Sequence, residues 1–196
     1  MKILIACEFS QIVTKAFRDK GHEAYSCDLL ETEGNPEWHI QADFRSAIQD
    51  TWDFVGYHYE CKVMANCGAR WLYEIPGRWE QLDEATEVFN ITLRDTRPGY
   101  SENPIQHKHT KQRIDREQDQ VVQPWYFGDP YFKATCLWLR DISPLKDTNR
   151  LIPPLKRTEE YKKWSMVHRA SPGKDRWKER SRAFPNFSEA MANQWG

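Results

Sequence analysis

The segment over residues 57–77 mixes aromatic residues, glycine and two cysteines, Cys61 and Cys67, a composition typical of an active-site loop. A cysteine thiolate is a strong nucleophile, so Cys61 could attack an electrophilic carbon if its pKa were lowered. The adjacent Glu60 would raise that pKa, and Lys62 would partly offset it. Because the two cysteines are six residues apart and form no CxxC pair, we predict no zinc site here.

A second chemically suggestive segment lies near the C-terminus and is strongly basic. Residues 162–182 hold eight Lys and Arg residues against Asp175 and Glu179. Such a surface attracts nucleic-acid phosphates, and Trp164 and Trp177 within it could stack on bases. We therefore predict nucleic-acid contacts from this segment. The candidate residues are Lys174, Arg176, Lys178, Arg180 and Arg182.

The formal net charge of −1 conceals two halves of opposite sign. Residues 1–104 hold 10 Lys/Arg against 18 Asp/Glu, a net charge of −8, and residues 105–196 hold 18 against 11, a net charge of +7. The near-neutral total is therefore a cancellation and does not exclude a polyanionic partner. At 196 residues the chain suits one domain, so we interpret these as an acidic and a basic half of one unit.

Composition also bears on the compartment. No apolar run approaches the roughly 20 residues that span a bilayer, and the start MKILIACEF meets an acid at once, unlike a secretory signal. The five cysteines are scattered and odd in number, which fits a reducing compartment better than a disulfide framework. We therefore expect a cytoplasmic protein without a membrane partner.

The elements that must position these side chains begin with a β-α-β unit. Residues 2–7 form a short apolar run typical of a buried strand, residues 12–20 place apolar side chains on one helical face, and residues 24–28 form a second strand. Such a unit predicts an α/β fold with a mostly parallel sheet. Ligands bind these sheets at the carboxyl ends of the strands. The residues expected at that edge are Phe9, Ser10 and Asp28.

The rest of the chain divides into further helices, strands and loops. Periodicity predicts helices around residues 43–49, 78–94 and 187–195, and buried strands over 52–56 and 134–139. Turn-forming or polar residues predict loops over 29–41, 95–104 and 107–120, the last of them mobile. His107 and His109 lie two residues apart without a cluster of acids or cysteines, which is typical of surface histidines.

Several of these pieces, taken in order, resemble one family. ACEFS follows the first strand, CDLL ends the second, WDF begins the next, and SENP and the late RSRAFPNFSEAMANQWG follow the cysteine-bearing loop. In this order the chain resembles a compact, phage-type relative of the DNA cytosine carbon-5 methyltransferases. The resemblance extends over nearly the whole chain and is strongest over residues 1–40, 123–148 and 168–196. It implies a single Rossmann-like domain of the SAM-dependent methyltransferase type over residues 1–196, with the acidic half on the cofactor side.

The resemblance implies a set of residues that bind SAM. Phe9 and Ser10 match the cofactor loop, in which Gln11 stands where related sequences have a glycine. Asp28 matches the acid expected on the ribose hydroxyls, and Asp53 matches the acid near the adenine.

The resemblance also implies a set of catalytic residues. Cys61 falls at the position of the nucleophile, although Tyr59 and Glu60 replace the preceding prolines, and Glu102 and Asn103 match the Glu-Asn pair of base recognition. In that chemistry a thiolate adds to carbon-6 of cytosine, and the glutamate holds ring nitrogen-3 and stabilises the developing charge. The turn-forming residues 97–100 stand where a strand would lead into Glu102.

Three functions remain open at this stage. The first is transfer of a methyl group from SAM to cytosine in DNA. The second is a catalytically inactive methyltransferase fold that binds nucleic acid or a host protein. The third is a pyrimidine-modifying enzyme that acts on a free pyrimidine nucleotide or uses another one-carbon donor.

Overall fold

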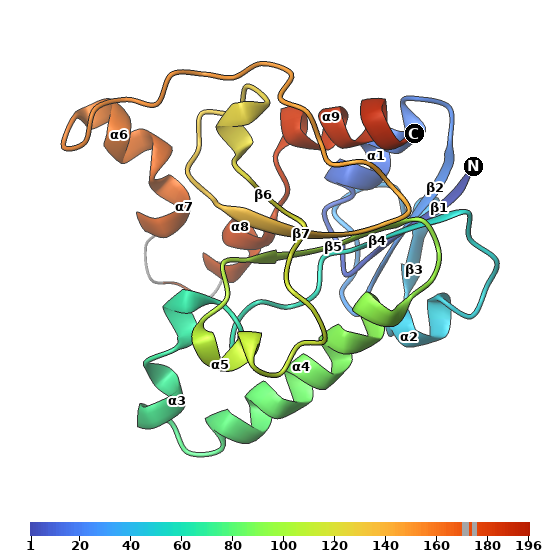
Figure 1. Cartoon of the computed structure of the whole chain (residues 1–196). Helices are drawn as coiled ribbons and strands as arrows, with labels where there is room; N and C mark the ends of the chain where they lie inside the picture. The colour runs from blue at the N-terminus through green and yellow to red at the C-terminus, as the bar shows by residue number, and fades with distance from the viewer. Residues whose placement is uncertain (170–172, 174–175) are drawn as a thin grey trace.

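The computed structural model describes residues 1–169, 173 and 176–196, which form one seven-stranded sheet in the order β3-β2-β1-β4-β5-β7-β6 (Figure 1). The neighbouring strands from β3 to β5 pair in parallel, and β7 pairs antiparallel with β5 and β6. The strands are β1 (Lys2–Ala6), β2 (Glu23–Asp28), β3 (His39–Gln41), β4 (Phe54–Tyr57), β5 (Gly99–Pro104), β6 (Gln120–Val122) and β7 (Thr135–Arg140). The predicted α/β class is confirmed, and the mostly parallel sheet is Rossmann-like.

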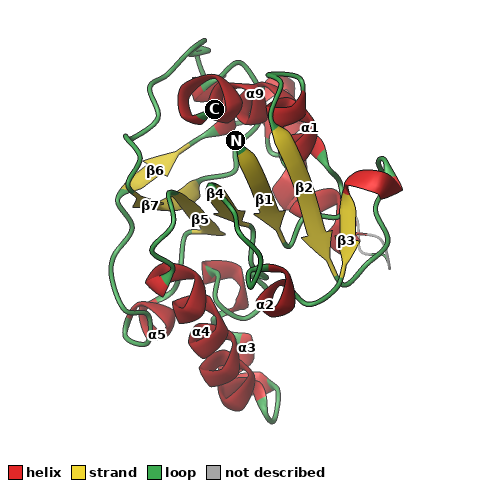
Figure 2. Ribbon diagram, turned by 90° about the vertical axis from the view of Figure 1, so that its right-hand side faces the viewer, coloured by secondary structure: helices red, strands yellow, loops and turns green. Residues whose placement is uncertain are grey.

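Helices cover both faces of the sheet (Figure 2). On one face α1 (Ile12–Arg18) and α9 (Pro185–Trp195) pack against Ile3 and Ile5 of β1. On the other face lie α2 (Phe44–Ala47) and α4 (Arg78–Arg94). Because successive side chains of a strand point to opposite faces, both faces of β1 are apolar and buried.

The remaining elements are short and lie in the connections between strands. They are η1 (Pro36–Trp38), η2 (Asn66–Gly68), α3 (Trp71–Glu74), α5 (Lys108–Lys111), η3 (Pro124–Tyr126), α6 (Glu159–Trp164), α7 (Met166–Arg169) and α8 (Arg176–Ser181). Throughout the part of the chain that is described, no helix combines the length and apolar character needed to cross a bilayer.

The predicted β-α-β unit is confirmed as β1, α1 and β2, with parallel pairing of the two strands. The helix predicted over residues 78–94 is α4, with the same bounds. The strand predicted over 134–139 is β7, and the final helix begins slightly earlier than predicted, at Pro185. A proline is favourable at the first helical position because it has no N–H to leave unpaired.

The prediction of a turn over residues 95–104 is wrong, because Gly99–Pro104 form the strand β5. Its two neighbours, β4 and β7, supply hydrogen bonds along both edges, and this pairing overrides the local preference of Pro98 and Gly99 for a turn. Gly99 has φ 145°, and a Cβ there would lie 2.0 Å from the carbonyl oxygen of Val55. The absence of a side chain at Gly99 therefore permits the close approach of β5 to Val55 of β4.

The two other predicted loops contain regular structure. Residues 29–41 include η1 and the edge strand β3, which pairs with β2. Residues 107–120 include α5 and are tied to α4, because the Asn90 side chain donates to the carbonyl of Arg113 and accepts from the N–H of Asp115. Residues 107–120 therefore hold a short helix, the start of β6 and a hydrogen-bonded connection in place of the predicted irregular loop.

Candidate functional site

Three predicted catalytic residues lie at the carboxyl ends of β4 and β5. Cys61 follows β4, and Glu102 and Asn103 lie in the last half of β5. Because β7 runs antiparallel, its first residue Thr135 and the preceding Lys133 lie at the same edge. Glu102, Lys133 and Thr135 line one pocket together with residues of α9.

Glu102 lies at the bottom of this pocket, with 13% of its side chain exposed. Burial raises the pKa of the carboxyl, while the Lys133 charge and a hydrogen bond from the Thr135 hydroxyl oppose this rise. The net shift is upward, which favours the protonated acid. A protonated carboxyl can donate a hydrogen bond, which a carboxylate cannot do.

Cys61 is close enough to Glu102 for the two groups to interact electrostatically. Burial, followed by the charge of Glu102, raises the pKa of the Cys61 thiol to about 11. The cations Lys133 and Arg180 act in the opposite direction. Glu102 from the neighbouring strand, rather than the adjacent Glu60, is thus the acid with the main effect. At neutral pH Cys61 is therefore a thiol in the protein without ligand.

Asn103 points to the opposite face of β5 from Glu102, as expected for successive residues of a strand. The side chain is fully buried, and its amide nitrogen donates to the carbonyl of Tyr59 at 3.1 Å. Its Oδ1 atom has no hydrogen-bond partner among the described residues. Asn103 therefore fixes the backbone that leads from β4 to Cys61.

The loop after β1 contains an acid that the sequence analysis did not select. Glu8 is buried, and its carboxylate accepts hydrogen bonds from the N–H groups of Val13 and Thr14 at the start of α1. Ser10 also donates to Glu8, at 3.4 Å. The N-terminus of α1, where parallel-sheet proteins often bind an anion, is thus occupied by a side chain of the protein itself. Glu8 could have been found from the sequence as an acid that lies shortly after a predicted strand and shortly before a predicted helix.

Gln11 has a left-handed backbone conformation with φ 56°, the region that glycine adopts most readily. Its side-chain amide donates to the Ser26 hydroxyl at 2.9 Å and to the Asn35 carbonyl at 3.0 Å, and it accepts from the Asn35 N–H at 2.7 Å. These hydrogen bonds join the β1 loop to β2 and to the loop that follows β2. Gln11 therefore fills space that a glycine would leave open.

Asp28 ends β2 and lies at the same edge of the sheet. Burial raises the pKa of its carboxyl, and its Oδ1 accepts from the Leu30 N–H. The next side chain, Leu29, is 71% exposed. An acid followed by an exposed apolar side chain suits a nucleoside, whose ribose offers hydroxyls and whose base offers a flat face.

Asp43 is a further acid at this edge. It follows β3 and binds Arg45 through both carboxylate oxygens. After burial, the charges of Asp28, Asp43 and Glu60 contribute to the upward pKa shift of the Cys7 thiol, so this edge of the sheet has a negative potential. Asp43 could have been found from the sequence if β3 had been predicted, because it would then have been an acid directly after a strand.

Asp53 does not join this group. It precedes β4, at the amino ends of the strands, and its carboxylate accepts from the Lys2 N–H at 2.7 Å. The structure thus brings Phe9, Ser10 and Asp28 to the carboxyl edge and leaves Asp53 at the opposite edge.

In the described part of the basic segment, α8 and Arg182 lie against the carboxyl edge. Trp177 of α8 contacts Phe9, with ring centroids 6.0 Å apart, and Arg180 lies 4.0 Å from the Cys67 sulfur. Arg182 forms a bidentate ion pair with Glu33, in which Nε donates to Oε2 and Nη2 donates to Oε1. The helix carries the candidates Arg176, Lys178 and Arg180, whereas Lys174 lies outside the described residues.

No protein-family model matches this chain, and the search of curated proteins finds no match. Within residues 1–169, 173 and 176–196, no cluster of three or more His, Cys, Asp and Glu side chains could hold a metal ion.

Proposed function

We propose that this chain is a SAM-dependent methyltransferase that modifies carbon-5 of cytosine in DNA. The observation that carries the proposal is that Cys61 and Glu102, which come from separate segments, both lie at the carboxyl ends of β4 and β5, where the Glu102 charge raises the pKa of the Cys61 thiol. A thiol next to a carboxylic acid provides the two groups needed to activate a pyrimidine ring. One is a nucleophile for carbon-6, and the other is a proton donor for nitrogen-3.

The chemistry at this pair can be written for the protein's own groups. The Cys61 thiol loses its proton to solvent, and the thiolate forms a bond from Sγ to carbon-6, while the electron pair of the carbon-5–carbon-6 double bond moves through the ring toward nitrogen-3. The proton of Glu102 lies toward nitrogen-3 and stabilises the charge that develops there. Carbon-5 would gain the methyl group that bound SAM supplies, leaving a neutral thioether, and nitrogen-3 would return its proton to Glu102. A water molecule then takes the proton of carbon-5, the carbon-5–carbon-6 double bond re-forms, and the bond to Sγ breaks with the electron pair remaining on Sγ. Lys133 and Arg180 favour the thiolate that this sequence requires.

The acidic carboxyl edge suits SAM on the nucleoside side. Asp28 would hold the ribose hydroxyls, Leu29 would pack against the adenine, and Phe9 and Ser10 would lie beside the ligand. The charges of Asp28, Asp43 and Glu60 favour a ligand that carries positive charge, as the sulfonium and ammonium groups of SAM do. When bound, SAM supplies an electrophilic methyl group.

The proposal is tested by incubating the chain with SAM and DNA and measuring 5-methylcytosine by mass spectrometry of the nucleosides. We expect methylation by the wild type and its loss in Cys61→Ala. Cys67→Ala, which removes an exposed thiol from the same loop, is the matched control and should retain activity. Methylation that persists in Cys61→Ala, or absence of SAM binding in calorimetry, would contradict the proposal.

DNA contact is tested separately through α8. Lys178→Glu should weaken DNA binding about tenfold at low salt, since each phosphate contact adds to the salt-dependent part of the affinity. Lys15→Glu on α1 carries the same charge change at an exposed position and should leave binding unchanged. Equal affinities of the two variants would argue against DNA contact through α8.

A binding module without catalysis is the second candidate. The observation that favours it is the Cys61 pKa of about 11, together with the occupation of the α1 N-terminus by Glu8. In that case a gel-shift experiment would show nucleic-acid binding that is the same with and without SAM and the same in Cys61→Ala. A change of affinity with SAM would favour the enzyme.

A further inference from the structure

Beneath Glu102 lies a buried pair of side chains that the proposed chemistry does not yet use. Tyr100 of β5 is fully buried, and its hydroxyl lies 2.7 Å from Nε2 of His58, the residue that follows β4. The two rings are edge to face, with centroids 5.6 Å apart. A Cβ at Gly56 would lie 2.7 Å from the Tyr100 ring. The absence of a side chain at Gly56 therefore makes room for the ring that reaches His58.

The direction of the Tyr100–His58 hydrogen bond can be assigned. Burial raises the pKa of Tyr100 well above its usual value, so the hydroxyl keeps its proton. In the described part of the chain, this hydroxyl has no hydrogen-bond partner besides His58. If Nε2–H were the donor, the hydroxyl proton would be buried without an acceptor, at a cost of about 1–3 kcal/mol. Tyr100 therefore donates to Nε2.

This direction determines the tautomer of His58. Burial, followed by the charge of Lys133, lowers the pKa of His58 to about 3, so the imidazole is neutral. A neutral imidazole that accepts at Nε2 carries its proton on Nδ1. Nδ1 faces Oε2 of Glu102 at 3.9 Å, and 11% of the His58 side chain and 13% of the Glu102 side chain are exposed. This distance is too long for a hydrogen bond, but catalytic hydrogen bonds often shorten when a ligand binds.

We propose that Tyr100 and His58 orient the Glu102 carboxyl, with His58 as a positioning residue that donates from Nδ1 to Oε2 when a pyrimidine occupies the pocket. This inference rests on the proposed function and deepens it. If Oε2 accepts from His58, the proton of the acid lies on Oε1, where it can be donated to the ring. Cytosine has an unprotonated nitrogen-3 that accepts this proton, whereas uracil carries a hydrogen there.

The other groups around Glu102 are compatible with this arrangement. Lys133 and Thr135 line the same pocket from the β7 side, and the Glu102 charge acts on Cys61 in the loop after β4. Ser188 of α9 lines the same pocket, but its hydroxyl donates to the Phe184 carbonyl. Glu8 acts on Tyr100, and its charge favours the protonated hydroxyl. The Lys133 charge favours the ionised form of Glu102. The orientation of the Glu102 carboxyl by His58 therefore matters at pH values at which Glu102 still carries its proton.

The proposal is tested by ¹⁵N NMR of His58 and ¹³C NMR of the Glu102 carboxyl in the full chain, without SAM or DNA. In the wild type we expect a neutral His58 with its proton on Nδ1. In Tyr100→Phe we expect a mixture that includes the Nε2–H form. The Nδ1 lone pair then faces Oε2 across 3.9 Å in part of the molecules. Because both side chains are largely buried, this reversed dipole disfavours the Glu102 carboxylate even without a hydrogen bond, so the Glu102 titration should shift upward.

Tyr73→Phe is the matched control. Tyr73 also has a hydroxyl hydrogen-bonded to a histidine, with 2.8 Å to Nε2 of His109, but this pair is exposed and comes from α3 and α5. Tyr73→Phe should leave His58 and Glu102 unchanged. Tyr100→Phe keeps the ring that packs against Phe54 and Trp195, so the fold should be retained.

Two results would overturn the proposal. One is a wild-type His58 with its proton on Nε2, and the other is a Glu102 titration that Tyr100→Phe does not change.

Should Tyr100→Phe fail to fold, His58→Asn and His58→Ala provide the comparison. The amide of His58→Asn can donate from the position of Nδ1, so only this variant should keep the wild-type Glu102 titration, and equal shifts in both would contradict the proposal. Because these measurements need no methyl transfer, an inactive protein with the expected spectra would contradict the proposed function alone.

Discussion

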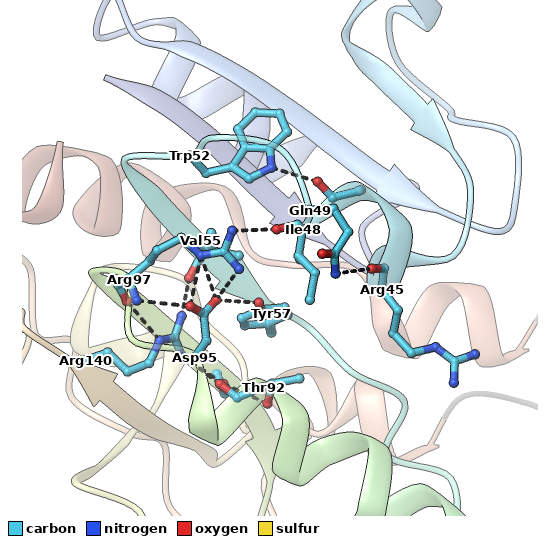
Figure 3. Close-up of polar contacts among 12 residues, drawn as sticks. Arg45, Ile48, Gln49, Trp52, Val55, Tyr57, Thr92, Asp95, Arg97 and Arg140 are labelled. Atoms are coloured by element: carbon cyan, nitrogen blue, oxygen red, sulfur yellow. Dashed lines mark hydrogen bonds and ion pairs between the residues drawn. The ribbon is translucent and has the colours of Figure 1, made fainter.

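The two ends of β4 and β5 hold buried polar clusters of opposite character. At the amino ends, the Arg140 guanidinium donates to the carbonyls of Val55, Thr92 and Arg97 (Figure 3). Nearby, Asp95 accepts from the Tyr57 hydroxyl at 2.6 Å and from Arg97 through its backbone and side chain. At the carboxyl ends, Glu102 faces His58 without a hydrogen bond, and the Glu102 charge raises the pKa of the Cys61 thiol.

The pKa values follow this difference in hydrogen bonding. Burial alone would raise the pKa of Asp95, but the hydrogen bonds from Arg97 and Tyr57 outweigh it and the pKa is lowered. For Glu102 burial dominates and the pKa is raised. A cluster whose groups are all paired stabilises the fold, whereas a buried carboxyl whose pKa is raised because hydrogen bonds do not offset its burial is available to a ligand. The comparison therefore separates a structural cluster from a candidate site on the same two strands.

The largest expected effect is on stability, from Arg140→Met. This change leaves several buried carbonyls without a donor and should lower the free energy of unfolding by about 3–5 kcal/mol. Lys15→Met breaks an exposed ion pair with Asp19 and serves as the control, with an expected loss below about 1 kcal/mol. Urea denaturation measures both, and equal losses would remove the distinction between a buried cluster and a surface pair.

The next effect is on activity, from Glu102→Gln. Loss of a general acid should reduce methyl transfer about 10²–10³-fold, while the fold is retained because Gln has the same shape. The assay is transfer of labelled methyl groups to DNA, with circular dichroism as the check on folding. Full activity of Glu102→Gln would show that the Glu102 carboxyl takes no part in methyl transfer, which would remove the functional difference between the two ends of β5.

The pH dependence of stability should differ in sign between the two clusters. Asp95 has a lowered pKa in the folded state, so its contribution is present above its unfolded value of about 3.9 and is lost as the pH falls through the folded value. Asp95→Asn should therefore cost about 1–3 kcal/mol near neutral pH and progressively less in acid.

Glu102 has a raised pKa, so its protonated form favours the folded state at low pH, and this contribution is lost as the pH rises through the folded value. Glu102→Gln should therefore stabilise the protein near neutral pH and lose that advantage below about pH 4.3. Urea denaturation across this range measures both variants. Parallel pH profiles for Asp95→Asn and Glu102→Gln would contradict the assigned shifts.

The smallest effect concerns the reactivity of Cys61. With a pKa of about 11, its alkylation by iodoacetamide should rise about tenfold for each pH unit between about pH 7 and 10. Glu102→Gln removes the neighbouring acid and should increase the rate a few-fold at a given pH. Mass spectrometry of the alkylated peptide follows Cys61 separately from Cys67. A rate that is independent of pH would mean that the thiol is already ionised.

Elements with a strong local signal could be predicted from the sequence, whereas elements that depend on pairing with distant strands could not. The 78–94 helix and the β-α-β unit were predicted because their apolar periodicity is strong and local. The strand β5 was missed because its start carries turn-forming residues, and its hydrogen bonds come from β4 and β7, which are distant in the sequence. Missing β3 concealed Asp43 for the same reason, and Asp53 was assigned without knowledge of which end of β4 it would occupy.

By itself, the sequence determined the α/β class, the position of Phe9, Ser10 and Asp28 at a strand end, and the division into an acidic and a basic half. Only the tertiary structure decided that Glu102 and Cys61 interact, that Glu8 occupies the start of α1, and that Tyr100 reaches His58. The physical reason is that periodicity and charge are properties of neighbouring residues. The pairing of side chains from different strands, and the pKa shifts that burial causes, exist only once the strands are assembled into a sheet.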